Sequence, residues 1–86
     1  MSFNSEVALR LERIAVMLDL LGEDSFRSAA NARAARAIAD LATDLEPIAL
    51  DQAKLRAIQG IGPKIAEKIS EFHRSGRIEE HDDLVA

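Results

Sequence analysis

The sequence lacks cysteine, tryptophan and tyrosine, and its 86 residues include only three phenylalanines, four glycines and two prolines. Without cysteine there is no disulfide framework and no thiolate metal site. No segment has the uncharged apolar run of a membrane span, and the first residues lack the basic-then-apolar pattern of a signal peptide. We therefore expect no membrane partner, and a cytoplasmic location, associated with the nucleoid if the source is bacterial.

The residues that are present favour helices. Alanine, leucine and glutamate dominate, whereas β-branched residues are sparse. A chain of this length has room for one small domain. We expect an all-α fold, a compact four-helix domain that spans residues 1–86.

Apolar spacing and cap residues place the four helices. The first should bury one stripe of side chains: Val7, Leu11, Ile14, Leu18 and Leu21. Asp24 or Ser25 should cap the second helix, and Asp51 the third. The expected segments run from Ser2 or Asn4 to Gly22, from Phe26 to Ala42, from Gln52 to Ile58, and from Pro63 to Arg74.

The net charge of −4 argues against nucleic acid, but the charges are unevenly distributed. Residues 1–25 and 78–86 are acidic. Residues 26–77 hold nine basic residues against six acids, which leaves a mildly basic middle. On charge alone, this middle segment is either an ordinary solvated surface or a nucleic-acid face.

The segment "QGIGPKIAEK" lies in the basic middle, between the third and fourth expected helices. Glycine allows positive φ and close approach of a ligand, and a helix N-terminus attracts anions. Gly60, Ile61 and Gly62, followed by Lys64, are therefore a candidate phosphate site, and we expect Gly62 to need positive φ. The alternative is a tight turn between two helices with no ligand.

The wider spacing is more specific, because it is that of a helix-hairpin-helix motif over residues 52–74. The positions that carry it are Leu55, Ile58, Gly60, Ile61, Gly62, Ala66 and Ile69. This motif is known as a binder of DNA backbone without sequence preference. The resemblance therefore favours DNA as the partner.

A longer comparison extends the resemblance. The stretches "FRSAANARAARAIADL" and "LRAIQGIGPKIAEKISEFHRSGRIEE" are similar to the amino-terminal domain of family X DNA polymerases. This resemblance implies binding to gapped or nicked DNA near a 5′ phosphate. In some members it also implies removal of 5′-deoxyribose phosphate through a lysine Schiff base. The chain contains no polymerase domain, so a missing catalytic domain is a candidate partner.

The resemblance assigns roles to individual residues. Lys68 stands at the Schiff-base position, and Lys64 and Arg27 stand at phosphate-binding positions. Arg56 keeps a basic residue ahead of the hairpin. The backbone carbonyls of Arg56, Ile58 and Ile61 stand where a monovalent cation, K⁺ or Na⁺, is held; we expect no other cofactor.

Three positions depart from the family pattern, namely Phe26, Asn31 and Glu80. Phe26 replaces a histidine that stacks on DNA, Asn31 replaces a tyrosine of the lyase site, and Glu80 replaces a phosphate-binding lysine. These changes weaken the phosphate pocket and the lyase. Lys68 has an alternative role, in which its stem covers apolar surface beside Ile65 and Ile69.

Another class of function fits the same sequence, a protein-interaction module that kept the fold and lost DNA binding. The acidic ends and Glu80 favour it. The arrangement of four cations separates the two hypotheses. A joined patch of Arg27, Arg56, Lys64 and Lys68 favours DNA, and their dispersal favours a protein partner.

Overall fold

The computed structural model describes residues 2–86, and every regular element in that range is helical. The elements are α1 (Phe3–Leu21), α2 (Ser25–Ala39), a short 3-10 helix (Glu46–Ile48), α3 (Gln52–Arg56), α4 (Pro63–Ser75) and α5 (Glu79–Val85). The all-α prediction is confirmed. The four expected helices are present, and α5 is a further short helix beyond the four predicted.

Capping residues explain why the helices begin where they do. Ser2 forms a capping box with Ser5 at the start of α1. Asp24 accepts the backbone N–H of Arg27 at 3.1 Å at the start of α2, and Asp51 accepts that of Lys54 at 3.1 Å at the start of α3. Each carboxylate satisfies one of the N–H groups that the first helical turn leaves without a partner.

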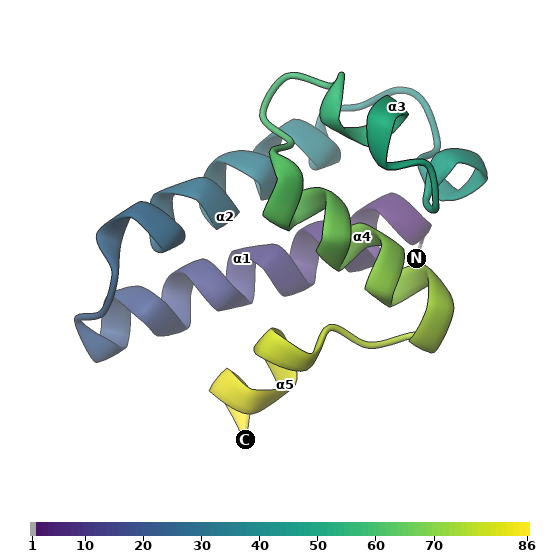
Figure 1. Ribbon diagram of the computed structural model, residues 1–86. Helices are drawn as coiled ribbons and strands as arrows, with labels where there is room; N and C mark the ends of the chain where they lie inside the picture. The colour runs from purple at the N-terminus through teal and green to yellow at the C-terminus, as the bar shows by residue number, and fades with distance from the viewer. Residues whose placement is uncertain (1) are drawn as a thin grey trace.

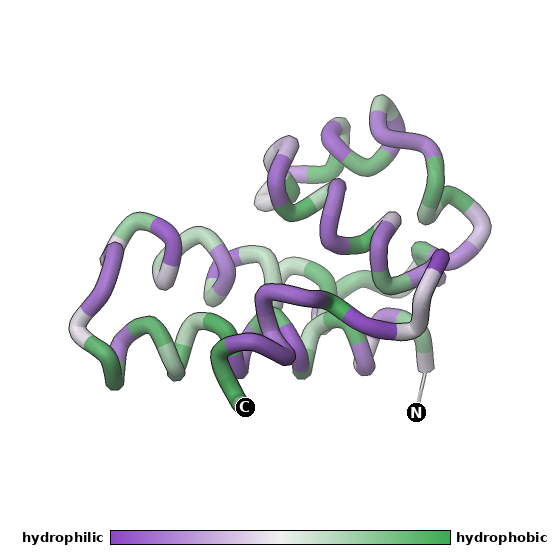
Figure 2. The backbone as a smooth tube through the Cα atoms, turned by 60° about the horizontal axis from the view of Figure 1, so that its bottom comes forward, coloured by the Kyte–Doolittle hydropathy of each residue, from purple (hydrophilic) through white to green (hydrophobic). Residues whose placement is uncertain are grey.

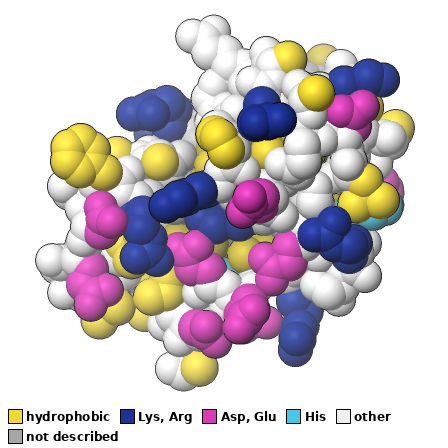
Figure 3. All heavy atoms as spheres, in the orientation of Figure 1, with side chains coloured by type: hydrophobic (Ala, Val, Ile, Leu, Met, Phe, Trp, Pro, Cys, Tyr) yellow, Lys and Arg dark blue, Asp and Glu magenta, His cyan; other side chains and the backbone are white. Residues whose placement is uncertain are grey.

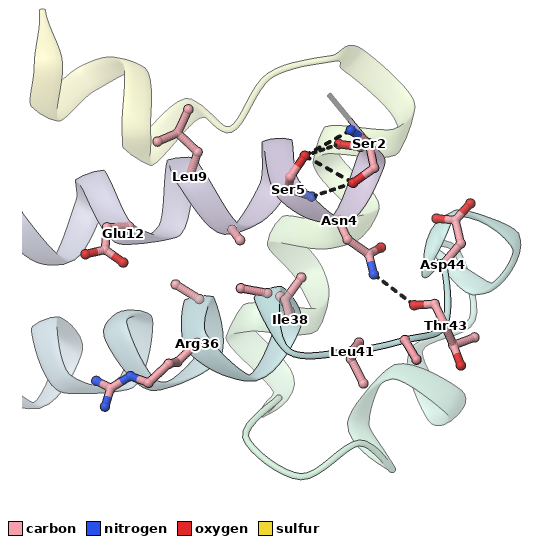
Figure 4. Close-up of a pocket in the computed structure, with 14 residues that line it drawn as sticks. Ser2, Asn4, Ser5, Leu9, Glu12, Arg36, Ile38, Leu41, Thr43 and Asp44 are labelled. Carbon is pink, nitrogen blue, oxygen red and sulfur yellow. Dashed lines mark hydrogen bonds between the residues drawn. The ribbon is translucent and has the colours of Figure 1, made fainter.

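The end of α2 differs from the prediction, because the helix stops at Ala39 and not at Ala42. A tertiary anchor explains the difference (Figure 4). The Asn4 side chain donates to the Thr43 carbonyl at 2.8 Å and accepts the Leu45 N–H at 2.8 Å. These two bonds hold the segment after α2 against the start of α1, so the chain must leave the helix early. The end of α3 also differs from the prediction, because this helix stops at Arg56 and not at Ile58.

The helices pack as a long antiparallel pair with the hairpin above it. Figure 1 shows α1 and α2 side by side, α3 and α4 over the end of the pair that holds the N-terminus, and α5 along α1. Among residues 2–86, no helix is both long and apolar enough to cross a bilayer.

One apolar core joins these helices. Figure 2 shows hydrophobic residues recurring along α1, whereas α5 is hydrophilic until its last residues. The predicted stripe is correct except at Leu21, which is 56% exposed, because α1 extends past the elements that cover it. The largest fully buried apolar side chains are Val7, Leu11, Ile14, Leu18, Ile38, Leu45, Leu55, Ile69 and Ile78.

Buried polar contacts fix the hairpin on this core. The Ser70 hydroxyl donates to the Ala49 carbonyl at 2.6 Å and accepts from the Gln52 side chain at 2.7 Å. Gln52 also donates to the Ala66 carbonyl at 3.0 Å. Since these bonds cross from the start of α3 to the middle of α4, they set the angle at which the turn between the two helices is presented.

Candidate nucleic-acid interface

The turn between α3 and α4 is held from both sides. The buried Ile61 side chain packs into the core, and its N–H donates to the Ile58 carbonyl at 3.1 Å. Gly60 adopts φ +93°, in the region that favours glycine. A Cβ at Gly60 would lie 3.1 Å from the Cβ of Ala37, so the turn lies directly against α2.

The expectation that Gly62 needs positive φ is wrong. Gly62 has φ −88° and ψ −177°, which is extended backbone open to any residue. It precedes Pro63, which favours this conformation in its neighbour, and its carbonyl accepts the Ala66 N–H at 2.9 Å as the N-cap of α4. Positive φ therefore requires glycine at position 60 and not at position 62. Gly62 has no side chain, so it leaves the start of α4 open to a ligand.

A hollow of about 730 Å³ lies along this turn, and we call it the hairpin hollow. The charged side chains that line it are all basic. Arg56 and Lys64 were predicted at this place. Arg33 was not, because it comes from α2 and reaches the hollow through the contact of Gly60 with that helix. All three side chains are exposed, and no Asp or Glu lines the hollow. The hairpin surface therefore carries a local positive charge despite the acidic chain.

A second hollow of about 460 Å³ lies one helical turn further along α4. It is lined by three cations and three carboxylates: Arg27, Lys64, Lys68, Glu67, Glu71 and Glu80. Lys64 lines both hollows and so links Arg56 to Arg27 and Lys68. The three carboxylates lie among the cations of the second hollow, so of these two only the hairpin hollow is purely basic. Figure 3 shows Lys and Arg side chains across the middle of this face, with acidic side chains both among them and below them.

The side chain of Lys68 is 13% exposed, and its amine is paired. Its Nζ lies 2.9 Å from Oε1 of Glu80 and donates to Oδ1 of Asn31 at 3.1 Å. Asn31 is itself buried and donates to the Arg27 carbonyl at 2.8 Å. Glu80 and Asn31 therefore occupy the Lys68 amine, which a Schiff-base lysine must have free to attack a carbonyl carbon.

Glu80 links the two cations of this hollow. Its Oε2 accepts from Nη2 of Arg27 at 2.6 Å, while its Oε1 faces Lys68. Burial alone would raise the pKa of the Glu80 carboxyl. The hydrogen bonds and charges of Arg27 and Lys68 outweigh burial, so its pKa is lowered from the ordinary value of 4.5. The hydrogen bond that Arg27 donates to Glu80 also raises the pKa of the Arg27 guanidinium.

This shift predicts how stability depends on pH. A carboxyl whose pKa is lower in the folded state contributes stability above its unfolded pKa, and loses it as the pH falls through the folded pKa. We expect the urea midpoint of the natural protein to fall more steeply below about pH 4.5 than that of Glu80→Gln. Urea titrations followed by circular dichroism check this. Parallel curves for the two proteins would show that the ion pairs contribute nothing.

The three carbonyl groups proposed as cation ligands belong to one turn. Arg56, Ile58 and Ile61 all line the hairpin hollow. The Ile58 carbonyl also accepts the Ile61 N–H, and a carbonyl oxygen has a second lone pair. A cation held by these backbone oxygens, the ligand type that K⁺ uses in proteins, stays a prediction.

A further hollow of about 720 Å³ lies between α1 and the end of α2 (Figure 4). Small apolar residues line much of it, and its charged residues are Glu12, Arg36 and Asp44. Two carboxylates against one guanidinium make a poor phosphate site. The basic hairpin hollow is therefore the better candidate for a nucleic-acid contact.

Comparison with known proteins agrees with this geometry. The sequence matches the helix-hairpin-helix domain family over residues 2–78, and the chain belongs to that family. Helix-hairpin-helix domains generally bind DNA without reading its sequence. No curated protein matches the sequence significantly.

Proposed function

We propose that this chain binds the DNA backbone through the turn between α3 and α4. The observation that supports this most strongly is the hairpin hollow, where Arg33, Arg56 and Lys64 gather with no acidic side chain. The first turn of α4 begins beside them at Pro63, and its free N–H groups attract phosphate oxygens. Amides and cations together form a site for a nucleic-acid phosphate.

The same site has nothing with which to read bases. Backbone amides and mobile cations contact phosphates, which are alike in every sequence. We expect two duplexes of equal length and unrelated sequence to bind with about equal affinity in fluorescence anisotropy titrations. A preference of about tenfold or more for one sequence at fixed salt would contradict the proposal.

We further propose a role in DNA repair, at gaps or nicks, as the amino-terminal domain of a family X polymerase or a free-standing relative. The sequence resemblance over the helices and "GIGPKIAEKI" supports this role. The partner would then be gapped DNA, together with a catalytic domain outside these 86 residues. Stronger binding to a gapped duplex than to an intact duplex of the same sequence is the expected result, and equal binding would contradict it.

We propose at most residual lyase activity for Lys68. The reaction needs its neutral amine to attack the aldehyde of the opened sugar, with loss of water, before β-elimination breaks the C3′–O bond and leaves a 5′ phosphate. The ion pair with Glu80 at 2.9 Å opposes the first step.

Borohydride trapping tests the lyase directly. We expect little or no covalent adduct with an incised abasic site, because the amine is paired and Asn31 offers no aromatic hydroxyl to position the sugar. A misplacement of about 1 Å can cost roughly a hundredfold in rate. Strong trapping that disappears in Lys68→Ala would overturn this expectation and make the domain an enzyme.

A monovalent cation forms part of the proposed DNA contact. The carbonyls of Arg56, Ile58 and Ile61 would hold K⁺ or Na⁺, and a bound cation would bring positive charge to a DNA phosphate. At constant ionic strength, DNA affinity should be higher in K⁺ than in tetramethylammonium, which is too large for such a site. Equal affinity in both salts would remove the cation from the proposal.

One observation favours the alternative, a protein-interaction module. Leu20, Leu21 and Phe26 are 75%, 56% and 88% exposed around the turn between α1 and α2. Large apolar side chains that are exposed close together often mark a contact with another protein. If the natural protein binds no DNA at low salt, this face becomes the leading candidate for its function.

A further inference from the structure

A carboxylate of the protein itself, that of Glu80, lies in the second hollow. Arg27 and Lys68 approach the two oxygens of the Glu80 carboxylate at 2.6 Å and 2.9 Å. Guanidinium and ammonium groups bind phosphate oxygens through the same charge-assisted hydrogen bonds. The carboxylate therefore stands where a phosphate would be bound by the same pair of cations.

We propose that Glu80 determines the DNA-end specificity of this domain, by filling the anion site of Arg27 and Lys68 and so excluding a terminal phosphate. This proposal rests on the proposed DNA binding at the hairpin. It adds a distinction between two anions, the phosphodiester inside a strand and the phosphate monoester at its end.

The charges around this hollow support the exclusion. Three cations face three carboxylates, so the formal charge of the lining is zero. A phosphate monoester brings nearly two negative charges at neutral pH. It would have to displace Glu80 and would still face Glu67 and Glu71, which line the same hollow. The hairpin hollow has no such opposing charge, so it accepts phosphodiesters while the second hollow excludes terminal phosphates.

Glu80 is held in place from both sides, which makes it a fixed feature of the site. Ile78, two residues before Glu80, is fully buried, and the following His81 is 7% exposed, with Nδ1 2.9 Å from Oδ1 of Asp82. The backbone N–H of Glu79 donates to Glu71 at 2.8 Å. These contacts hold the backbone of α5 in position, and the two ion pairs with Arg27 and Lys68 hold the Glu80 carboxylate itself.

The test compares gapped duplexes that carry a 5′ phosphate, a 3′ phosphate or only hydroxyl groups at the gap. We expect the natural protein to bind all three about equally. Glu80→Gln removes the charge but keeps the shape, and should bind the phosphorylated gaps about tenfold more tightly than the hydroxyl gap. Glu79→Gln is the matched control, since it makes the same charge change at an exposed position on the same helix.

Two results would overturn the proposal. One is a natural protein that already prefers a terminal phosphate strongly, and this measurement needs no variant. The other is a folded Glu80→Gln, or Glu80→Ala if the first variant does not fold, that treats the three gaps alike. A closed dumbbell duplex without ends separates this proposal from the hairpin function. If the natural protein fails to bind the dumbbell at low salt, the hairpin proposal has failed independently of Glu80.

Discussion

Replacing Gly60 by valine should lower the free energy of unfolding by about 3 kcal/mol and abolish DNA binding. Gly60 has φ +93°, which a β-branched residue strongly disfavours. Its new Cβ would also lie 3.1 Å from the Cβ of Ala37, so the turn would be pushed away from α2. That movement separates Arg33 from Arg56 and Lys64 and breaks up the basic hollow.

Urea unfolding and anisotropy titrations measure the two effects. Gly62→Ala is the control, because Gly62 has φ −88° and a Cβ there would meet nothing within 4 Å. This control should unfold at nearly the same urea concentration as the natural protein. If Gly60→Val matches the natural protein in both stability and affinity, the glycine is an ordinary turn residue and the turn is not the DNA contact.

Neutralising the hairpin cations should have the second large effect. In the triple variant Arg33→Gln, Arg56→Gln, Lys64→Gln, we expect a loss of DNA affinity of about a hundredfold or more at about 0.1 M salt. The three side chains are exposed, so their removal should leave the fold and its urea midpoint nearly unchanged.

The control for this variant carries the same change of net charge elsewhere. Arg13, Arg36 and Arg74 are exposed and do not line the hairpin hollow. Their joint replacement by glutamine should lower affinity only slightly, through long-range attraction. An equal loss in both triple variants would mean that overall charge, and not the hairpin, controls binding.

Local chemistry made most of the fold predictable. Asp24, Asp51 and Pro63 mark helix starts by rules that depend only on neighbouring residues, and the structure confirms each of them. The end of α2 was not predictable in this way. It depends on Asn4, whose bonds to Thr43 and Leu45 span about forty residues of sequence, and no local pattern announces such a contact.

The candidate site, like the fold, has some residues that local spacing predicts and others that depend on contacts between distant parts of the chain. The spacing around "GIGPK" was enough to indicate the hairpin, Arg56 and Lys64. Arg33 could be found only once Gly60 was seen to pack against α2. The sequence indicates at Glu80 the loss of a cation, but the pairing of Glu80 with Arg27, 53 positions earlier, is visible only in the folded chain. Ion pairs between distant residues leave no periodic signal in a sequence.

The salt dependence of DNA binding tests the central claim most directly. If the hairpin cations and amides hold three or four phosphates, a plot of log affinity against log salt should be linear with a slope of about −3. The slope should be the same for duplexes of unrelated sequence and should approach zero in the triple hairpin variant. A natural protein that binds no DNA at low salt, or binds with an affinity that salt does not change, would contradict the account.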